Sequence, residues 1–239
     1  MFIQGVTLKG INVYDASFNS KGALLYVDAG NSSSYSGSGT TWTDLSTNTN
    51  NATLVSPNFT SAGAASYFSF NGAGTQNATT ASAKYVQAYT GKTVFVAARM
   101  ANSSFTAGTF RGLFGTAAGS RNFNTYIYAP SSGVYQIHYS AGGGGGMSNN
   151  LPLTYMQWFI ISVTQTTGGL VTYYFNGQPV GTNTGVTFAQ YVNSGNTENI
   201  AFTDNFWYGD ISVTSVYGRA LSNGEITQNF NAIRGRYSI

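Results

Sequence analysis

Residues 158–177 read WFIISVTQTTGGLVTYYFNG, and they decide the fold class of the chain. Two runs rich in β-branched and aromatic residues, Trp158 to Gln165 and Leu170 to Phe175, flank the four residues Thr166 to Gly169. Two such runs joined by a short loop containing glycine are typical of a β-hairpin. The next two residues, Asn176 and Gly177, tolerate the positive φ angles of a tight turn. The stretch therefore predicts consecutive antiparallel strands.

The same pattern extends over most of the chain. From Ala23 onward, short alternating runs are separated by clusters of Gly, Asn, Ser and Thr, which predicts an all-β sandwich. Besides the two runs above, we expect strands at Leu24–Asp28, Ala65–Phe70, Tyr85–Ala88, Thr93–Met100, Gly112–Thr116, Asn124–Tyr128, Val134–Tyr139 and Ile211–Tyr217. The run Gly142 to Gly146 has too few side chains to pack, so we expect an exposed loop there.

One short helix is expected at the C-terminal end. Ser222-Asn223-Gly224-Glu225 is a capping box, in which the Ser hydroxyl and the Glu carboxylate each accept a backbone N–H. Ile226, Phe230 and Ile233 then recur at helical spacing, and Gly235 supplies a stop signal. The apolar stripe predicts a helix that packs on the sandwich.

Residues 1–20, MFIQGVTLKGINVYDASFNS, alternate only weakly and end in a polar stretch. We interpret them as an arm that docks on the domain or on a neighbouring subunit, and residues 21–239 as the sandwich domain. The first residues lack the basic segment and apolar run of a secretion signal. We expect neither signal-directed export nor membrane insertion.

The composition excludes several function classes. Charged residues make up 7% of the chain, whereas an ordinary domain has about 25%. Aromatic residues make up 15%, enough to supply a folded core beneath a polar, uncharged surface. The ten basic residues are scattered, so we expect no nucleic-acid binding. The absence of cysteine excludes disulfides, Cys-ligated zinc and a thiol nucleophile.

Groups for catalysis are scarce. The single histidine, His138, shares a strand face with Gln136, opposite Ile137, and we expect it to face solvent. A Ser-His-Asp triad would need a positioned serine, and the chain has no Gly-x-Ser-x-Gly motif. We therefore expect no nucleophilic hydrolysis.

Glycoside hydrolysis requires two carboxyl groups roughly 5 to 9.5 Å apart. Of the two glutamates, Glu225 belongs to the capping box and Glu198 lies in a polar segment. Asp204 and Asp210 would be roughly 20 Å apart along one extended strand. We expect no enzyme, and a glycoside hydrolase stays only a remote alternative.

Aspartates could also bind calcium, which prefers oxygen ligands. The candidates are Asp28, Asp44, Asp204 and Asp210, with Asp15 in the arm. None of them belongs to an Asp-x-Asp arrangement, so structural roles at strand ends are the favoured interpretation. We expect no metal and no cofactor.

Aromatic side chains could form a binding surface, because sugar rings pack their C–H faces on Trp and Tyr. The run Phe206-Trp207-Tyr208 and the group Tyr126, Tyr128, Tyr135 and Tyr139 attract attention. We take Trp207, Tyr208, Tyr128 and Tyr135 as candidate carbohydrate-binding residues. The alternative is that such residues belong to the core or to subunit interfaces.

A set of short motifs adds a family resemblance. Near the N-terminus these are Asp28-Ala29-Gly30-Asn31, Tyr35, Gly37 to Ser46, Asn51, Thr53-Leu54 and Phe68 to Gly72. Near the C-terminus they are Gln157-Trp158-Phe159, Tyr174 to Gly177, Gly209-Asp210-Ile211, Tyr217 to Ser222, Glu225-Ile226, Asn229-Phe230 and Gly235-Arg236-Tyr237. With these motifs, residues 22–239 resemble the laminin G-like, concanavalin A-like domains of tailed-bacteriophage structural proteins. Asn71 stands where that family usually has Asp, which argues against a metal role there.

The resemblance implies an all-β, two-sheet antiparallel jelly-roll sandwich with a short C-terminal helix. It also implies a non-catalytic virion structural protein, in capsid decoration, a head fibre or a tail fibre, that contacts other virion proteins and its own copies. Virion localisation and affinity for a host surface glycan are part of the same expectation. The alternative is a carbohydrate-binding module that recognises host surface polysaccharide. Fold alone does not choose between these functions.

Overall fold

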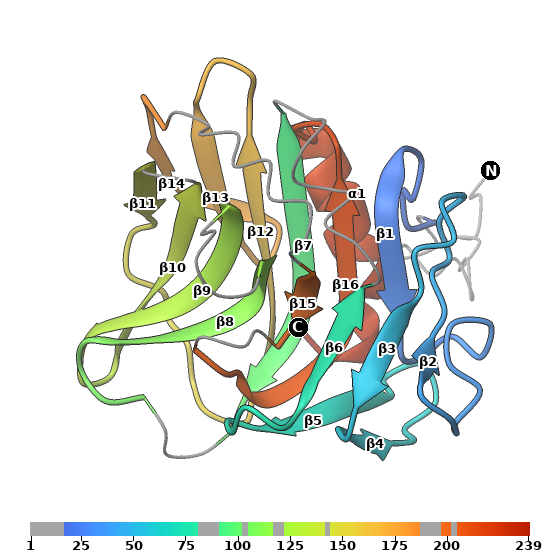
Figure 1. Ribbon diagram of the computed structural model, residues 1–239. Helices are drawn as coiled ribbons and strands as arrows, with labels where there is room; N and C mark the ends of the chain where they lie inside the picture. The colour runs from blue at the N-terminus through green and yellow to red at the C-terminus, as the bar shows by residue number, and fades with distance from the viewer. Residues whose placement is uncertain are drawn as a thin grey trace, which may run out of the picture.

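A computed structural model describes residues 17–80, 91–101, 105–116, 122–141, 144–186, 197–201 and 205–239. In this part of the chain, two eight-stranded antiparallel sheets pack face to face, and one α-helix lies on the outside (Figure 1). The predicted fold class, an all-β two-sheet sandwich with one short C-terminal helix, is confirmed. No helix among the described residues is long and apolar enough to span a membrane.

The two sheets, called sheet A and sheet B, draw their strands from distant parts of the chain. Sheet A contains, in spatial order, β14 (Gln178–Asn183), β13 (Val171–Phe175), β12 (Trp158–Gln165), β7 (Lys92–Met100), β16 (Tyr208–Tyr217), β5 (Tyr67–Asn71) and β4 (Asn58–Thr60), with β1 (Ala23–Asp28) also paired to β16. Sheet B contains β11 (Gly144–Met147), β10 (Val134–Ala141), β9 (Asn122–Ser131), β8 (Thr109–Thr116), β15 (Glu198–Ile200), β6 (Asn77–Thr80), β3 (Ala52–Val55) and β2 (Thr41–Trp42).

The hairpins predicted from residues 158–177 are present. β12 pairs with β13 across the predicted loop, and β13 turns into β14 at Asn176 and Gly177. Their φ angles are 48° and 75°, the positive values that a two-residue hairpin turn needs. The predicted strand Tyr85–Ala88 lies outside the described residues.

The remaining differences concern short or glycine-rich strands. The strands β2, β3, β4, β6, β11, β14 and β15 were not predicted, because they are only two to six residues long. The expected loop at Gly142 to Gly146 is wrong for residues 144–146, which belong to β11 and pair with β10. A methyl group on Gly146 would lie 2.1 Å from Asn183 Oδ1 and 2.7 Å from Tyr173 Oη. Glycine here lets the edges of the two sheets approach each other.

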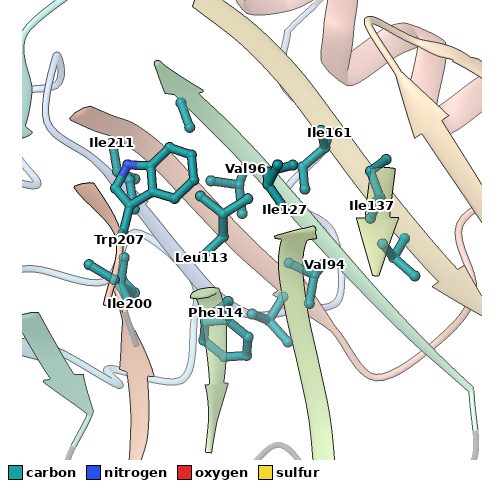
Figure 2. Packing of buried hydrophobic residues seen from close by; sticks show 14 of the residues in the cluster. Val94, Val96, Leu113, Phe114, Ile127, Ile137, Ile161, Ile200, Trp207 and Ile211 are labelled. Carbon is teal, nitrogen blue, oxygen red and sulfur yellow. The ribbon is translucent and has the colours of Figure 1, made fainter. Parts of the chain in front are cut away.

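The main core fills the space between the sheets (Figure 2). Period-two alternation decides which side chains enter it, so Ile127 of β9 and Ile137 of β10 point inward beside Leu113 and Val96. The neighbours of Ile127 and Ile137 along each strand point to the outer face of sheet B.

The helix α1 (Asn223–Ile233) covers the outer face of sheet A, beside β16 and β7 (Figure 1). Ile226, Phe230 and Ile233 are buried there against side chains of β7, β12, β13 and β16, as the stripe predicted. The helix ends at Ile233 with Arg234 as its C-cap, so the predicted stop residue Gly235 directly follows the cap; it lies inside a 3₁₀ turn, η1 (Arg234–Arg236).

The capping box at the start of α1 is confirmed. Glu225 Oε2 accepts the Ser222 backbone N–H, and Ser222 Oγ accepts the Glu225 N–H. Arg219 adds a bidentate ion pair, donating to both Glu225 oxygens at 2.6 and 2.8 Å. These hydrogen bonds, chiefly those from Arg219, lower the pKa of Glu225 to about 2.

The last residues of the predicted arm pack on the domain. Phe18 stacks on Tyr26, with ring centroids 4.5 Å apart, and the Asn19 carbonyl accepts a hydrogen bond from the Tyr217 hydroxyl. Residues 1–16 lie outside the described part of the chain. An assembly role for the arm therefore stays a prediction.

A buried charged pair lies between the sheets. Lys92 of β7 is 1% exposed and Glu198 of β15 is fully buried. Burial lowers the pKa of Lys92 to about 7, although the charge of Glu198 acts in the opposite direction.

This pair predicts a pH-dependent stability. An unfolded lysine has a pKa of about 10.4, so the unfolded chain keeps a proton that the folded chain releases above about pH 7. The free energy of unfolding should therefore rise between pH 7 and 9, by at most about 1.4 kcal/mol per pH unit. Urea denaturation across this range measures the slope. A variant with both Lys92→Met and Glu198→Gln should lose it, and an equal slope in wild type and variant would contradict the prediction.

Candidate functional site

Two of the four residues proposed from the sequence lie in the core. Trp207 is 0% exposed and lies between the sheets (Figure 2). Its ring packs edge-on against those of Phe105 and Phe159, with ring centroids 6.3 Å apart in both pairs. Tyr135 is 3% exposed, and its hydroxyl donates to the Tyr155 hydroxyl at 2.7 Å. Neither ring can stack on a sugar, so their assignment as binding residues is corrected.

The other two, Tyr128 and Tyr208, are half-buried and lie on different sheets. Tyr128 is on β9 of sheet B, and Tyr208 begins β16 of sheet A. The structure therefore does not bring the four candidates together. Alternation along each strand separates Tyr128 from Tyr135, because Tyr135 shares the inward face of Ile137.

The outer side of β8, β9 and β10 carries a cluster of rings that we call the aromatic face: Phe110, Tyr126, Tyr128 and His138. The register places Phe110 opposite Tyr128, and Tyr126 opposite His138. No helix of the described chain packs on this side, whereas α1 covers the outer side of sheet A. The aromatic face is thus a sheet surface with large side chains and no helix over it.

The four rings are in mutual contact. Phe110 stacks on Tyr128 with centroids 4.3 Å apart and an interplanar angle of 21°. His138 meets Phe110 edge-on at 5.0 Å and lies 5.7 Å from Tyr126. The prediction that His138 and Gln136 share a face opposite Ile137 is confirmed, but the His138 ring is half-buried among these aromatics. Mutual packing holds the rings in a defined orientation.

A small pocket of about 70 Å³ opens within this face. Its lining consists of Phe110, Tyr126, His138, Ser140 and Asn205. The volume is about that of two water molecules, which is enough for a hydroxymethyl group but not for a whole sugar ring. The surface thus offers a broad apolar contact with one polar recess.

Polar groups surround the rings. The Tyr126 hydroxyl accepts a hydrogen bond from Asn124 Nδ2 at 2.7 Å, and Gln136 donates to Asn150 Oδ1 at 3.1 Å. None of the pocket's lining residues is an Asp, Glu, Lys or Arg. An uncharged ligand with hydroxyl groups suits this combination of rings and amides better than an ion.

The aspartates considered as calcium ligands have structural partners. Asp44 accepts the backbone N–H groups of Tyr26, Ser46 and Asn50, which orders the loop after β2. Asp28 pairs with Arg236, and Asp210 pairs with Arg99. Among the described residues, no three side chains of His, Asp or Glu gather as a metal site. Asp15 and Asp204 lie outside the described residues.

Sequence comparisons identify no relatives: no family model and no curated protein matches the chain. Solved structures are similar in fold. Domain 4 of AbnA, a GH43 extracellular arabinanase from Geobacillus stearothermophilus solved in complex with arabinotriose, is 13% identical with a TM-score of 0.62. The alignment covers 87% of this chain and 97% of that domain.

Two toxin binding domains are also similar. The binding domain of Paraclostridial Mosquitocidal Protein 1 is 11% identical, has a TM-score of 0.67, and aligns over 89% of this chain. The binding domain of Botulinum Neurotoxin DC, in complex with SialylT, is 14% identical with a TM-score of 0.63 over 90% of this chain. The chain spans about half of each, 52% of their length. At such identities the likeness shows the fold alone, a two-sheet jelly-roll sandwich.

Proposed function

We propose that this domain binds carbohydrate on the aromatic face of sheet B and catalyses no reaction. The observation that carries the proposal is the cluster of half-buried rings, Phe110, Tyr128 and His138, packed over a buried Tyr126 on a sheet side that no helix of the described chain covers. Aromatic rings in contact with one another lose little freedom when a ligand arrives, which reduces the cost of binding.

The chemistry of the face fits a sugar. A sugar ring presents C–H groups on its faces and hydroxyl groups at its edge. Tyr128 and Phe110 would contact the C–H groups, while Gln136, Ser140 and Asn205 would exchange hydrogen bonds with hydroxyls. The recess of about 70 Å³ has room for an exocyclic hydroxymethyl group.

The structural comparisons are compatible with this function. One similar domain was solved with arabinotriose and another with SialylT. Because these likenesses show fold only, they support a jelly roll that can bind sugars, and the assignment to this chain rests on its own residues.

Replacing Tyr128 by Ala should weaken binding of the preferred saccharide about tenfold or more, because a half-buried ring of the contact surface is lost. A glycan array first identifies the saccharide, and isothermal titration then measures its dissociation constant for wild type and variant. Leu170→Ala serves as the control, since Leu170 is an exposed apolar residue in the β12–β13 hairpin loop.

Two results would reject the aromatic face as the sugar site. One is unchanged affinity in the Tyr128→Ala variant. The other is an equal loss in the Leu170→Ala variant, which would show that the effect is not local. Circular dichroism confirms that each variant is folded before titration.

The absence of catalysis is part of the same proposal. Glu225 is held by Arg219 and the capping box, Glu198 is buried between the sheets, and Asp210 is bound to Arg99. Glu225 and Asp210 are thus held by structural partners, and Glu198 has no access to the aromatic face. Release of reducing sugar from the bound oligosaccharide on prolonged incubation would overturn this part.

We further propose where the domain is used. It belongs to the virion of a tailed bacteriophage and assembles with virion proteins and with its own copies. The support for this proposal is the resemblance of residues 22–239 to domains of tailed-bacteriophage structural proteins. Mass spectrometry of purified virions tests the location. Light scattering of the chain with and without residues 1–16 tests self-assembly through the arm.

A further inference from the structure

We infer that a hollow on the outer face of sheet A, built around Arg99 and Asp210, is a second binding site, for an uncharged, hydroxyl-rich ligand such as a neutral sugar residue. It lies on the opposite sheet from the aromatic face and stands on different residues. The inference therefore goes beyond the proposed function and does not depend on it.

The floor of the hollow belongs to one row of residues across five strands. Asn58, Ser69, Asp210 and Arg99 line the hollow, and Trp158 continues the row beside it. The ladder pairs Asn58 of β4 with Ser69 of β5, Ser69 with Asp210 of β16, Asp210 with Arg99 of β7, and Arg99 with Trp158 of β12. All five side chains point to the outer face, because Phe68 and Phe70, which flank Ser69, enter the core. Polar residues at one level of neighbouring strands form a continuous polar floor.

The charges in this floor compensate each other. Arg99 donates from Nε and Nη2 to Asp210 Oδ2 at 2.7 and 2.6 Å, and the Ser69 hydroxyl donates to Oδ1 at 2.6 Å. Both charged side chains keep some exposure, 19% for Arg99 and 11% for Asp210. A carboxylate has about four acceptor positions and a guanidinium five donors, so the pair can still accept and donate hydrogen bonds. An ionic ligand would be attracted by one partner and repelled by the other.

Aromatic rings hold the guanidinium in place, and two tyrosines, Tyr67 and Tyr208, form the walls of the hollow. The Arg99 guanidinium lies 4.9 Å from the Tyr67 ring centre and 5.2 Å from that of Trp158. Trp158 in turn stacks on Tyr237 at 4.7 Å. Tyr208, opposite Asn71 on the neighbouring strand, lines the other side. An apolar C–H surface of a ligand would rest on such walls.

The rim offers hydrogen-bonding groups that the protein does not use. The hollow measures about 340 Å³, within the usual range of ligand pockets, and Asn58, Asn71, Gln76 and Met156 also line it. Gln76 is engaged with the Asn71 N–H and the Ser56 carbonyl. Within the described residues, neither the Asn58 amide nor Nδ2 of Asn71 has a hydrogen-bond partner. Two amides at the rim of a neutral polar floor point to a ligand rich in hydroxyl groups.

Tryptophan fluorescence can report on this site. Trp158 is half-buried beside the hollow, whereas Trp42 and Trp207, the other two tryptophans, are fully buried. The probes are the neutral trisaccharides arabinotriose, maltotriose, cellotriose, chitotriose and mannotriose, with 3′-sialyllactose and trigalacturonic acid as acidic counterparts. At least one neutral probe should change the fluorescence saturably, and the acidic probes at equal concentration should not.

The variants Tyr208→Ala and Asn58→Ala should each weaken that binding about tenfold, because one wall or one rim amide is lost. Leu170→Ala and Tyr128→Ala should leave it unchanged. A double variant, Arg99→Met with Asp210→Leu, removes the polar floor without leaving a lone buried charge and should abolish binding while the protein stays folded.

The outcomes separate the two sites. Binding lost in Tyr128→Ala and unaffected in Tyr208→Ala and Asn58→Ala overturns the second site and leaves the proposed function standing. Binding lost only in the hollow variants supports the second site, and the aromatic face is then judged separately, by the titration of the Tyr128→Ala variant. Absence of any fluorescence change with the neutral probes, or a preference for the acidic ones, overturns the inference.

Discussion

Replacing Arg236 by Met is expected to lower the free energy of unfolding by about 3 to 5 kcal/mol, because it leaves a buried carboxylate without its counter-charge. Asp28 is 0% exposed, and its Oδ2 accepts a hydrogen bond from Arg236 Nη1 at 2.7 Å. The Gly30 backbone N–H at 2.9 Å and the Tyr26 hydroxyl at 3.3 Å are further donors, but neither carries a positive charge. Urea denaturation at neutral pH measures the loss.

A double variant separates the lost charge from lost packing. Asp28→Asn combined with Arg236→Met removes both charges, so it should regain much of the stability that the single change loses. A single variant within about 1 kcal/mol of wild type would show that the pair is no more than a surface ion pair.

The same pair explains why the C-terminal end matters to the fold. It joins η1 to the end of β1, and the next residue, Tyr237, donates to Ser212 Oγ and stacks on Trp158. The last turn of the chain is thereby attached to three strands of sheet A, β1, β16 and β12. Loss of Arg236 should also loosen Tyr237 and Trp158, the rings behind the Arg99 hollow.

Replacing Trp207 by Ala should cost about 3 to 5 kcal/mol of unfolding free energy, whereas Tyr208→Ala should cost much less. Trp207 fills the core beside Ile211 and Ile200, and its Nε1 donates to the Asp210 carbonyl at 3.4 Å (Figure 2). Its removal leaves a cavity between the sheets, while Tyr208 is only half-buried at the surface. Denaturation of the two variants under one condition gives the comparison.

The pair of variants also tests roles in binding. The Trp207→Ala protein, where it remains folded, should keep its saccharide affinity, because the ring touches no surface. Equal stability losses in the two variants would contradict the assignment of Trp207 to the core and Tyr208 to the surface.

Local sequence was sufficient to predict the elements that depend on interactions between residues close together in the chain. The hairpin of β12 and β13, the Asn176-Gly177 turn between β13 and β14, and the capping box of α1 depend on residues a few positions apart, and all were predicted. The glycine-rich strand β11 was not predicted. Glycine is needed there because a methyl group on Gly146 would collide with Asn183 in the other sheet.

The candidate sites were only partly predictable. Alternation was sufficient to place Gln136 and His138 on one face of β10 and Tyr135 with Ile137 on the other, but it did not indicate which tyrosines of the two strands reach the surface. Along β9 and β10, aromatic residues occupy both faces, so their chemical type does not reveal their side. Trp207 and Tyr208 are neighbours in the chain with opposite environments for the same reason.

By itself, the sequence determined the all-β class, the antiparallel hairpins and the packing helix, because these follow from periodicity and turn chemistry over short distances. Tertiary structure alone decided which sheet face α1 covers, which aromatics reach the surface of the other sheet, and which charges meet. Asp28 and Arg236 are 208 positions apart, and Arg99 and Asp210 are 111 apart. Such pairs depend on strand order and register, and a shift of one residue in register would send each side chain to the opposite face of its sheet.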